Sequence, residues 1–214
     1  TTVIRAEYLT ASKLHCKPTS MGAGYATVEV SNNDRDYSVD GVQFEFVAVS
    51  VTEITPWNGP EVGDTEVTLK GTSFMNNELQ CQFGTASAVT ATWDSSTQVR
   101  CLAPSQGSTG WMEAVLLSFS VTYESSTNFY YHTKVYVSEV TPVVGPLGGG
   151  TRVNVLGSNF KDAGRWMCKF TDSGKTVDAR FLDTNQLECT SPAHTAGNKQ
   201  VEVTMNAQQY SDSD

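Results

Sequence analysis

Cysteine is the residue type with the clearest chemistry in this chain, because two thiols on facing strands can form a disulfide. Cys81 and Cys168 each begin a Cys-x-Phe sequence, and about 20 residues further on Cys101 and Cys189 each precede a proline by three positions. The two pairs have the same local context and nearly the same spacing. The sequence therefore predicts the disulfides Cys81–Cys101 and Cys168–Cys189. Each bridge closes a loop that the chain-entropy estimate values at roughly 3 kcal/mol.

The fifth cysteine, Cys16, lies in a context that matches the second cysteine of each pair. Leu14-His-Cys16 is followed by Pro18, and no cysteine precedes it. We therefore expect Cys16 to be unpaired through truncation. Five reduced thiols in the core of an intracellular protein are the alternative interpretation, since cysteines on facing strands can remain free in a reducing compartment.

Residues for catalysis or for a bound cofactor are sparse. The three histidines are His15, His132 and His194, which are far apart in the sequence, and no Gly-x-Ser-x-Gly nucleophile motif is present. No Cys-x-x-Cys or His-x-x-x-His spacing indicates zinc. Gly148-Gly-Gly150 lacks the Lys-Ser/Thr of a phosphate loop and is interpreted as a turn before a strand. We expect neither enzymatic activity nor a cofactor.

Three acidic residues form a candidate site for calcium binding. Asp34, Asp36 and Asp40 lie within a polar stretch at residues 31–41. Carboxylate oxygens are suitable calcium ligands, but the spacing differs from an EF-hand and Arg35 lies between the acids. A solvated hairpin loop is the default interpretation of this segment.

Aromatic residues provide the candidates for ligand contact. Trp57 lies in a turn rich in proline and glycine, and Tyr130 and Tyr131 lie near the boundary between two repeats. Exposed aromatic rings can stack on sugars or anchor a protein partner. The other tryptophans fall in or beside strand patterns and are expected in the core: Trp93, Trp111 and Trp166.

The elements that position these residues occur twice. Residues 52–74 and 138–160 share a series of identical residues at a constant offset of 86 positions. In the first copy these are Thr55-Pro56, Gly59-Pro60, Gly63, Thr65, Val67, Gly71 and Phe74. A fixed period of this length indicates that one β unit is copied in tandem.

Within one copy the apolar residues alternate as they do in half-buried strands. We expect strands at 50–55, 65–70, 79–83, 89–93, 98–102, 112–123 and from 128 onward, with the segment 56–60 as a turn. Seven short strands separated by turns predict an immunoglobulin-like β-sandwich.

The series I-x-P-x-x-G-P, G-x-x-V-x-L-x-G-x-x-F, C-x-F-G and V-x-C-x-x-P resembles the IPT/TIG domain, the immunoglobulin-like module of plexins, Met-type receptors, fibrocystin-like proteins and some transcription factors. The resemblance implies an all-β chain of tandem sandwiches: the C-terminal half of a domain at 1–47, a complete domain at 48–136, and a domain at 137–214 that lacks its last strand. The boundaries contain β-branched residues without a Gly/Ser spacer, so we expect a stiff, rod-like array.

The amino-acid composition limits the classes of partner that the chain can bind. The net charge of −9 and a pI of about 4.8 argue against nucleic acid and other polyanions. The longest apolar run, which begins at Ala114, is too short to span a membrane. We expect partners among other protein surfaces or neighbouring repeats, with a glycan as an alternative ligand.

The functional expectation is a non-enzymatic structural or adhesive array, extracellular or at the cell surface, that holds binding surfaces at fixed spacing as part of a longer chain. Alternatives are a receptor ectodomain, or a module that recognises carbohydrate or another ligand. Dimerisation of the transcription-factor type is implied by part of the family, but the acidic balance and the paired cysteines argue against it. Partial domains at both ends would also permit strand exchange between molecules.

Overall fold

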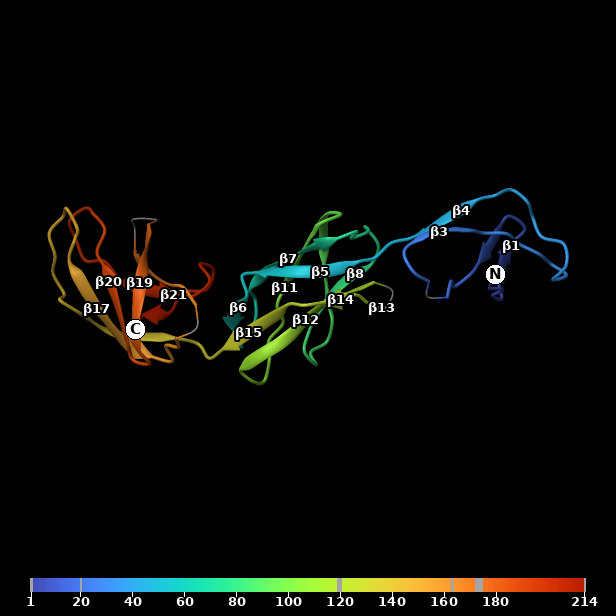
Figure 1. Ribbon diagram of the computed structural model, residues 1–214. Coiled ribbons are helices and arrows are strands. Elements are labelled where there is room, and N and C mark those ends of the chain that lie inside the picture. The colour runs from blue at the N-terminus through green and yellow to red at the C-terminus, as the bar shows by residue number, and fades with distance from the viewer. Residues whose placement is uncertain (1, 20, 119–120, 163, 172–174, 214) are drawn as a thin grey trace. The chain divides into compact units, whose positions relative to one another are not determined.

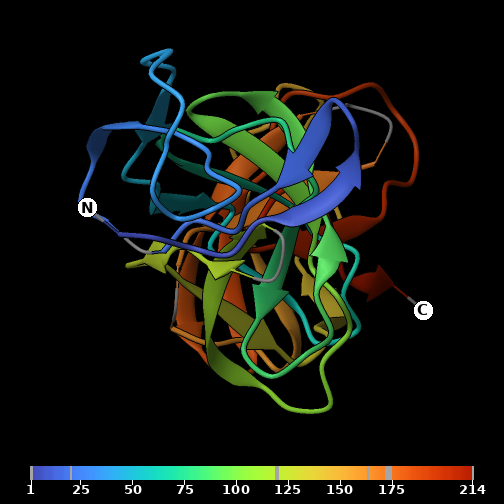
Figure 2. The ribbon, with the colours of Figure 1, turned by 90° about the vertical axis from the view of Figure 1, so that its right-hand side faces the viewer.

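The computed structural model describes residues 2–19, 21–118, 121–162, 164–171 and 175–213. Every regular element in these ranges is a β-strand (Figures 1 and 2). None of the described residues belongs to a helix that is long and apolar enough to cross a membrane. The chain divides into two compact units, Thr1–Ala48 and Val49–Asp214.

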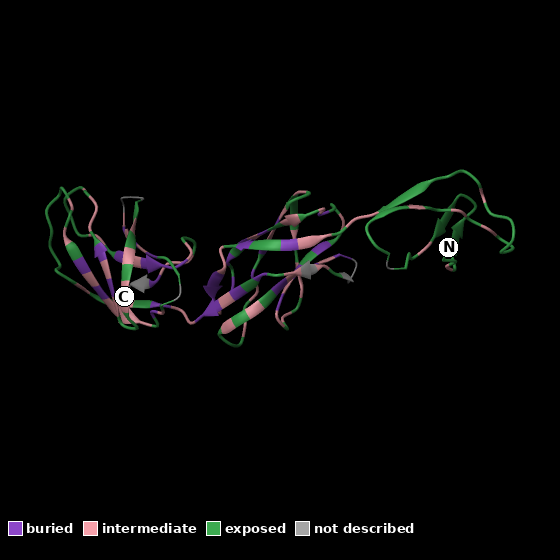
Figure 3. Ribbon diagram, viewed as in Figure 1, coloured by how far each residue is buried: buried purple, intermediate pink, exposed green. Residues whose placement is uncertain are grey.

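The first unit consists of two antiparallel strand pairs. β1 (Glu7–Thr10) pairs with β2 (Lys13–His15), and β3 (Gly24–Thr27) pairs with β4 (Gln43–Phe46). Its described residues are exposed or half-buried throughout, as the green and pink ribbon in Figure 3 shows. The part of this unit that the structure describes therefore has no hydrophobic core.

The second unit contains two β-sandwiches, here called the central sandwich (residues 49–133) and the C-terminal sandwich (residues 135–214). One layer of the central sandwich has the strand order β10-β11-β7-β5-β14. The strands of this layer are β5 (Ser50–Thr55), β7 (Glu66–Thr72), β10 (Thr92–Ser95), β11 (Gln98–Leu102) and β14 (Glu124–Ser125).

The other layer of the central sandwich has the order β6-β15-β12-β8-β9, and β13 (Val121–Thr122) pairs with β12. Its strands are β6 (Asn58–Pro60), β8 (Leu79–Phe83), β9 (Val89–Thr90), β12 (Gly110–Ser118) and β15 (Asn128–His132). β15 pairs in parallel with β6 and antiparallel with β12, so it completes this layer.

The C-terminal sandwich repeats this plan with one long strand in place of two. Its order is β21-β18-β19-β20-β17-β16-β22. β19 pairs with β18 through its first half and with β20 through its second half, where the central sandwich uses β9 and β10 separately. The strands are β16 (Tyr136–Thr141), β17 (Arg152–Ser158), β18 (Trp166–Phe170), β19 (Thr176–Asp183), β20 (Gln186–Thr190), β21 (Val201–Thr204) and β22 (Asp212–Ser213).

Side chains alternate between inward and outward positions along the strands, and the inward ones form the two hydrophobic cores. The buried residues are the purple segments in Figure 3. On β7 the side chains of Val67 and Leu69 are fully buried, and their counterparts Val153 and Val155 on β17 are buried in the same way. The repeated phenylalanines, Phe74 and Phe160, are buried as well. The expected all-β, tandem immunoglobulin-like fold is therefore confirmed.

One repeated glycine is explained by a close approach of two strands. A Cβ atom at Gly71 would clash with the carbonyl oxygen of Ser50, and a Cβ at Gly157 would clash with that of Tyr136. The ring of the following phenylalanine, Phe74 or Phe160, approaches the same position to 2.6 Å. Glycine is the residue that leaves room for both neighbours.

The segment 56–60, expected as a turn, is partly a strand. After Pro56 the chain leaves β5 and enters the other layer, where Asn58–Pro60 forms β6. Its backbone pairs with β15, and the Tyr130 N–H donates to the Trp57 carbonyl at 2.8 Å. A proline is tolerated here because β6 is an edge strand.

Candidate functional site

The disulfides connect the two layers of each sandwich. Cys81 on β8 is bonded to Cys101 on β11, and Cys168 on β18 is bonded to Cys189 on β20. All four residues are buried. Cys16 in the first unit is free and half-buried.

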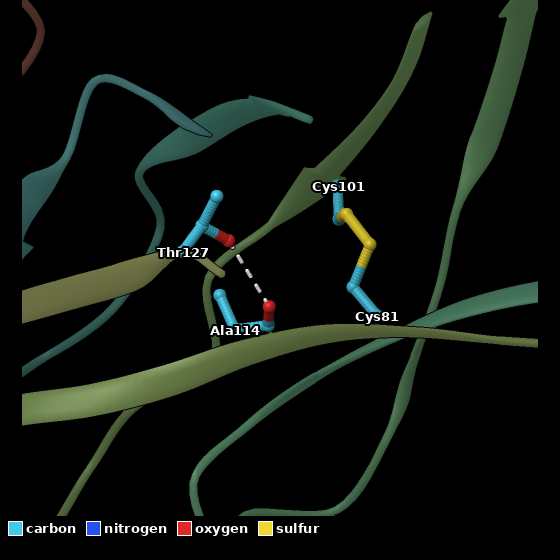
Figure 4. The surroundings of a disulfide bond; sticks show 4 residues. All are labelled: Cys81, Cys101, Ala114 and Thr127. Carbon is cyan, nitrogen blue, oxygen red and sulfur yellow. Dashed lines mark hydrogen bonds between the residues drawn. A yellow bond between two sulfur atoms is a disulfide. The ribbon is translucent and has the colours of Figure 1, made fainter. Parts of the chain in front are cut away.

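Beside the first disulfide, a buried threonine anchors the segment that leads into β15. The Thr127 hydroxyl donates to the Ala114 carbonyl oxygen at 3.2 Å (Figure 4). Because Ala114 lies on β12, this bond joins the start of β15 to its neighbour close to the covalent cross-link. The layer that carries Cys81 is thus held by a hydrogen bond close to the disulfide.

Three aromatic residues gather on the outer surface of the β6–β15–β12 layer. This aromatic cluster consists of Trp57, Trp111 and Tyr130. Trp57 stacks on Trp111 with ring centroids 5.6 Å apart and planes inclined by 21°, and Tyr130 lies 5.1 Å from Trp111. Trp111 is 60% exposed, while the other two are half-buried. One indole face is therefore open to solvent and supported from behind by a second ring.

The C-terminal sandwich contacts the buried side of this cluster. The Lys161 ammonium donates to the Tyr130 hydroxyl at 3.1 Å and lies 5.7 Å from its ring centroid. At Gly164 an added Cβ would come within 2.5 Å of the Trp57 ring. The Trp57 indole can pack there because Gly164 has no side chain.

A second set of contacts between the sandwiches is polar. It is made by the junction loop, defined as residues 206–210, which follows β21. The Asn206 amide donates to the Asn58 carbonyl at 3.2 Å and to the Gln209 side-chain oxygen at 2.7 Å. The Gln209 amide donates to the Asp64 carbonyl at 2.9 Å, and its oxygen accepts from the buried Thr65 hydroxyl at 3.0 Å.

Gln208 extends this set to the beginning of β7. Its side-chain amide group binds the backbone of Glu66 through two hydrogen bonds. The loop therefore joins the C-terminal sandwich to residues 58 and 64–66 of the central sandwich, while the aromatic cluster supplies a separate contact at Lys161 and Gly164.

A hollow of about 260 Å³ lies at this junction, lined by residues that include Asp64, His132 and Gln209. His132 is buried, and its Nδ1 is 2.9 Å from the Thr133 carbonyl oxygen. Burial lowers the pKa of His132 below its usual value, so the imidazole is held neutral. Asn58 is also buried, and its side-chain amide makes no hydrogen bond to the described residues.

The structure changes the interpretation of several aromatic residues. Tyr131 is fully buried, its hydroxyl donates to the Pro104 carbonyl at 3.0 Å, and burial raises its pKa to about 12. It is therefore not available for ligand contact, because inward and outward positions alternate on β15. Trp111 and Trp93 were expected in the core and are exposed instead, whereas Trp166 is buried as expected.

The acidic segment 31–41 forms a hydrogen-bonded loop. Asp34 accepts from the Tyr37 hydroxyl at 2.6 Å, and Asp36 accepts from the Asn33 amide at 2.8 Å. Among the described residues, no group of three His, Cys, Asp or Glu side chains is placed to hold a metal ion, so Asp34, Asp36 and Asp40 do not form such a group.

Each histidine lies in a different place and contacts its own neighbour. His15 is exposed in the first unit, 3.8 Å from Glu7. His194 lies in the C-terminal sandwich with its Nε2 3.1 Å from the Thr171 carbonyl oxygen. The Nδ1 atom of His132 is 2.9 Å from the Thr133 carbonyl oxygen at the junction.

The junction loop was not identified from the sequence. Its signal is the amide-rich run Asn206-Ala-Gln-Gln-Tyr210 directly after a buried strand. Side-chain amides carry both donors and acceptors and so suit the binding of exposed backbone groups.

Comparison with known proteins agrees with this architecture. The IPT/TIG domain matches residues 50–133 and 135–214. The chain is 25% identical over 190 residues to human fibrocystin-L and 27% identical over 167 residues to human plexin-A3. These alignments cover 86% and 72% of this chain but only 4% and 9% of the relatives.

The structure of the plexin A4 full extracellular region, domains 1 to 10, superposes with a TM-score of 0.56 at 15% identity, over 96% of this chain and 20% of that one. This likeness shows a shared fold. Two copies of the motif, matched along most of the sequence, show that the chain belongs to the IPT/TIG family.

Proposed function

We propose that the chain is a non-enzymatic, extracellular segment that holds β-sandwich surfaces at fixed spacing for contact with other protein surfaces or neighbouring repeats. The observation that supports this most strongly is the pair of contact sets between the central and C-terminal sandwiches. One set holds Trp57 and Tyr130 against Gly164 and Lys161, and the other holds the backbone of Asn58, Asp64 and Glu66 through the junction loop.

The connection between the two sandwiches is short. β15 ends at His132 and β16 begins at Tyr136, so three residues link them. Each hydrogen bond of the junction loop contributes about 0.5–1.5 kcal/mol net, and several acting together favour one arrangement over a freely jointed one. The indole and tyrosine rings add apolar burial where they meet Gly164 and Lys161.

An extracellular location is supported by two observations. Buried disulfides persist in oxidising compartments and are rare in the cytosol. The superposition with a plexin extracellular region supports the same location. The net charge of −9 does not favour a polyanionic partner.

The test measures the distance between the sandwiches in the full chain. Spin labels at the exposed positions Thr90 and Thr176, in a Cys16→Ser background, report it by pulsed electron resonance. We expect one narrow distance distribution for the parent and a broader one for the triple variant N206A/Q208A/Q209A. The matched control is Gln80→Ala, an exposed glutamine on β8. A broad distribution in the parent protein would contradict fixed spacing.

Ligand recognition is a second candidate function, favoured by the open face of Trp111 in the aromatic cluster. An exposed indole that is already held by a neighbouring ring loses little conformational freedom when a ligand covers it.

A further inference from the structure

The aromatic cluster continues into a polar strip along β12. Trp111, Glu113 and Val115 alternate with residues that face the core, since Ala114 and Leu116 are buried. The three therefore lie on the outer face of the layer, spaced by roughly 7 Å for each two residues.

Neighbouring strands place matching side chains beside them. The register pairs Trp111 with Tyr130, and Glu113 with Asn128, on β15. On the other side Val115 pairs with Gln82 of β8. The outer face thus passes from aromatic rings to a carboxylate and an amide, and then to a second amide.

The polar groups in the middle of the strip are free to bind a ligand. No described residue forms a hydrogen bond or an ion pair with the side chains of Glu113 and Asn128. Both residues are exposed. The rings beside them are fixed by stacking, so the strip presents pre-positioned apolar and polar groups at the same time.

A hollow of about 460 Å³ extends the strip on the far side of Glu113. Glu113 and Val115 form one wall, and Thr122, Tyr123 and Ser125 complete the lining. Two hydroxyls of this lining come from threonine and serine and a third from tyrosine. The surface that runs from Trp111 to this hollow is therefore long, shallow and rich in hydrogen-bonding groups.

We propose that this surface, here called the β12 strip (Trp57, Trp111, Tyr130, Glu113, Asn128 and Gln82, with the adjoining hollow), binds an uncharged oligosaccharide. The apolar face of a sugar ring would stack on Trp111. Hydroxyl groups of the next sugar would donate to the Glu113 carboxylate and exchange hydrogen bonds with the Asn128 amide. Further hydroxyls would reach the hollow.

The charge of the strip selects against acidic sugars. Glu113 lies at its centre and the whole chain carries a net charge of −9, so a uronate or sulfate group would be repelled. Lys161, a cation that contacts the cluster, is already bonded to the Tyr130 hydroxyl. A protein partner anchored by the indole would not require the free hydrogen-bonding groups in the middle of the strip. Trp57 and Tyr130 also contact the C-terminal sandwich, whereas Trp111, Glu113, Asn128 and Gln82 carry the proposed sugar contacts, so the Trp111→Ala test does not depend on the junction loop.

The experiment applies the full chain to an array of neutral oligosaccharides of glucose, mannose, galactose and xylose, together with a matching set that carries uronate or sulfate groups. Binding to neutral members is expected, with a change in tryptophan fluorescence because Trp111 becomes covered. Trp111→Ala is expected to weaken that binding roughly tenfold or more, since exposed tryptophans dominate contact surfaces of this kind.

Two further variants separate a binding role from a folding role. Leu102→Ala removes an exposed apolar side chain from the other layer and is expected to leave binding unchanged. Glu113→Gln keeps the size and one acceptor oxygen, replaces the other oxygen by an amide donor and removes the charge, and is expected to reduce the discrimination against acidic sugars. No neutral oligosaccharide bound at millimolar concentration, tighter binding of acidic sugars by the parent, or full binding by a folded Trp111→Ala protein would each overturn the proposal.

Discussion

The side-chain amide of Gln208 binds both backbone polar groups of Glu66, although 142 residues separate them. The Glu66 N–H donates to Gln208 Oε1 at 2.8 Å, and Gln208 Nε2 donates to the Glu66 carbonyl at 2.8 Å. This is the arrangement that a neighbouring β-strand residue would offer. The contact therefore depends on the side chain of one partner and on the backbone of the other.

That asymmetry gives the first prediction. Gln208→Ala should weaken the junction by about 1–2 kcal/mol, because two hydrogen bonds are lost. Hydrogen exchange at the Glu66 amide should accelerate accordingly. Glu66→Ala should leave the junction intact, since the Glu66 backbone is retained. Equal effects of the two substitutions would show that the Glu66 carboxylate, rather than its backbone, is recognised.

The disulfides give the second prediction. Replacing Cys81 and Cys101 together by alanine should lower the free energy of unfolding by about 3 kcal/mol, because the unfolded chain regains the freedom of a closed loop. Cys168→Ala with Cys189→Ala should act similarly on the C-terminal sandwich. Urea denaturation measures both, with Cys16→Ser as a control that should have no effect. One thiol, that of Cys16, should be alkylated in the native, unreduced protein, and alkylation of three or more would refute the pairing.

The third prediction concerns the repeated glycine beside the phenylalanine. Gly71→Ala and Gly157→Ala should each destabilise their own sandwich by roughly 1–3 kcal/mol, since the new methyl group meets a backbone carbonyl that cannot move freely. Gly107→Ala should be tolerated because nothing lies within 4 Å of the added Cβ. Thermal unfolding distinguishes the three variants. An unchanged thermal stability of the Gly71→Ala protein would mean that the close approach of β7 to β5 leaves room for a methyl group.

The fourth prediction is a loss of stability in mild acid through His132. Burial lowers its pKa in the folded state, and Lys161 opposes its charge while Glu61 favours it. Between the usual histidine pKa of about 6.5 and the lower folded value, the unfolded chain binds more protons. The free energy of unfolding should therefore fall as the pH decreases through that window and should be constant above it.

His132→Gln should flatten this dependence, because glutamine can still donate to the Thr133 carbonyl but does not titrate in the window. The exposed His15 provides the matched control, and His15→Gln should keep the slope of the parent. Urea denaturation at a series of pH values between 7.5 and 5 measures all three proteins. A slope that survives in His132→Gln would assign the acid sensitivity to other groups.

The sequence predicted those features of the fold that depend on residues within one strand or one hairpin. The glycine and phenylalanine of the repeat follow from contacts within one hairpin, and the alternation at Val67 and Leu69 predicts a buried face. β6 was missed because a segment with two prolines and a glycine indicates a turn, and only its pairing with β15 makes it a strand. The exposure of Trp111 could have been found by extending the alternation of Ala114 and Leu116 backward by one step.

The junction could not have been predicted in the same way. Gln208 and Gln209 belong to a polar run without periodicity, and apart from the Thr65 hydroxyl their partners in the central sandwich are backbone groups more than 140 residues earlier in the chain. Backbone donors and acceptors are present at nearly every residue, so the sequence does not mark them. Asn58 and His132, which are buried at the junction, likewise resemble ordinary surface residues in the sequence.

The parallel pairing of β6 with β15 also determines how the central sandwich resists tension. A pull toward the N-terminus enters the sandwich at β5 and reaches β6 at Asn58 through it, and a pull toward the C-terminus acts on β15 after His132. Because the two strands run in the same direction, these forces slide one strand along the other. The bonds from the Tyr130 N–H to Trp57 and from the Glu61 N–H to His132 then bear the force together instead of breaking in turn. The β6–β15 pair is therefore loaded in shear along the chain.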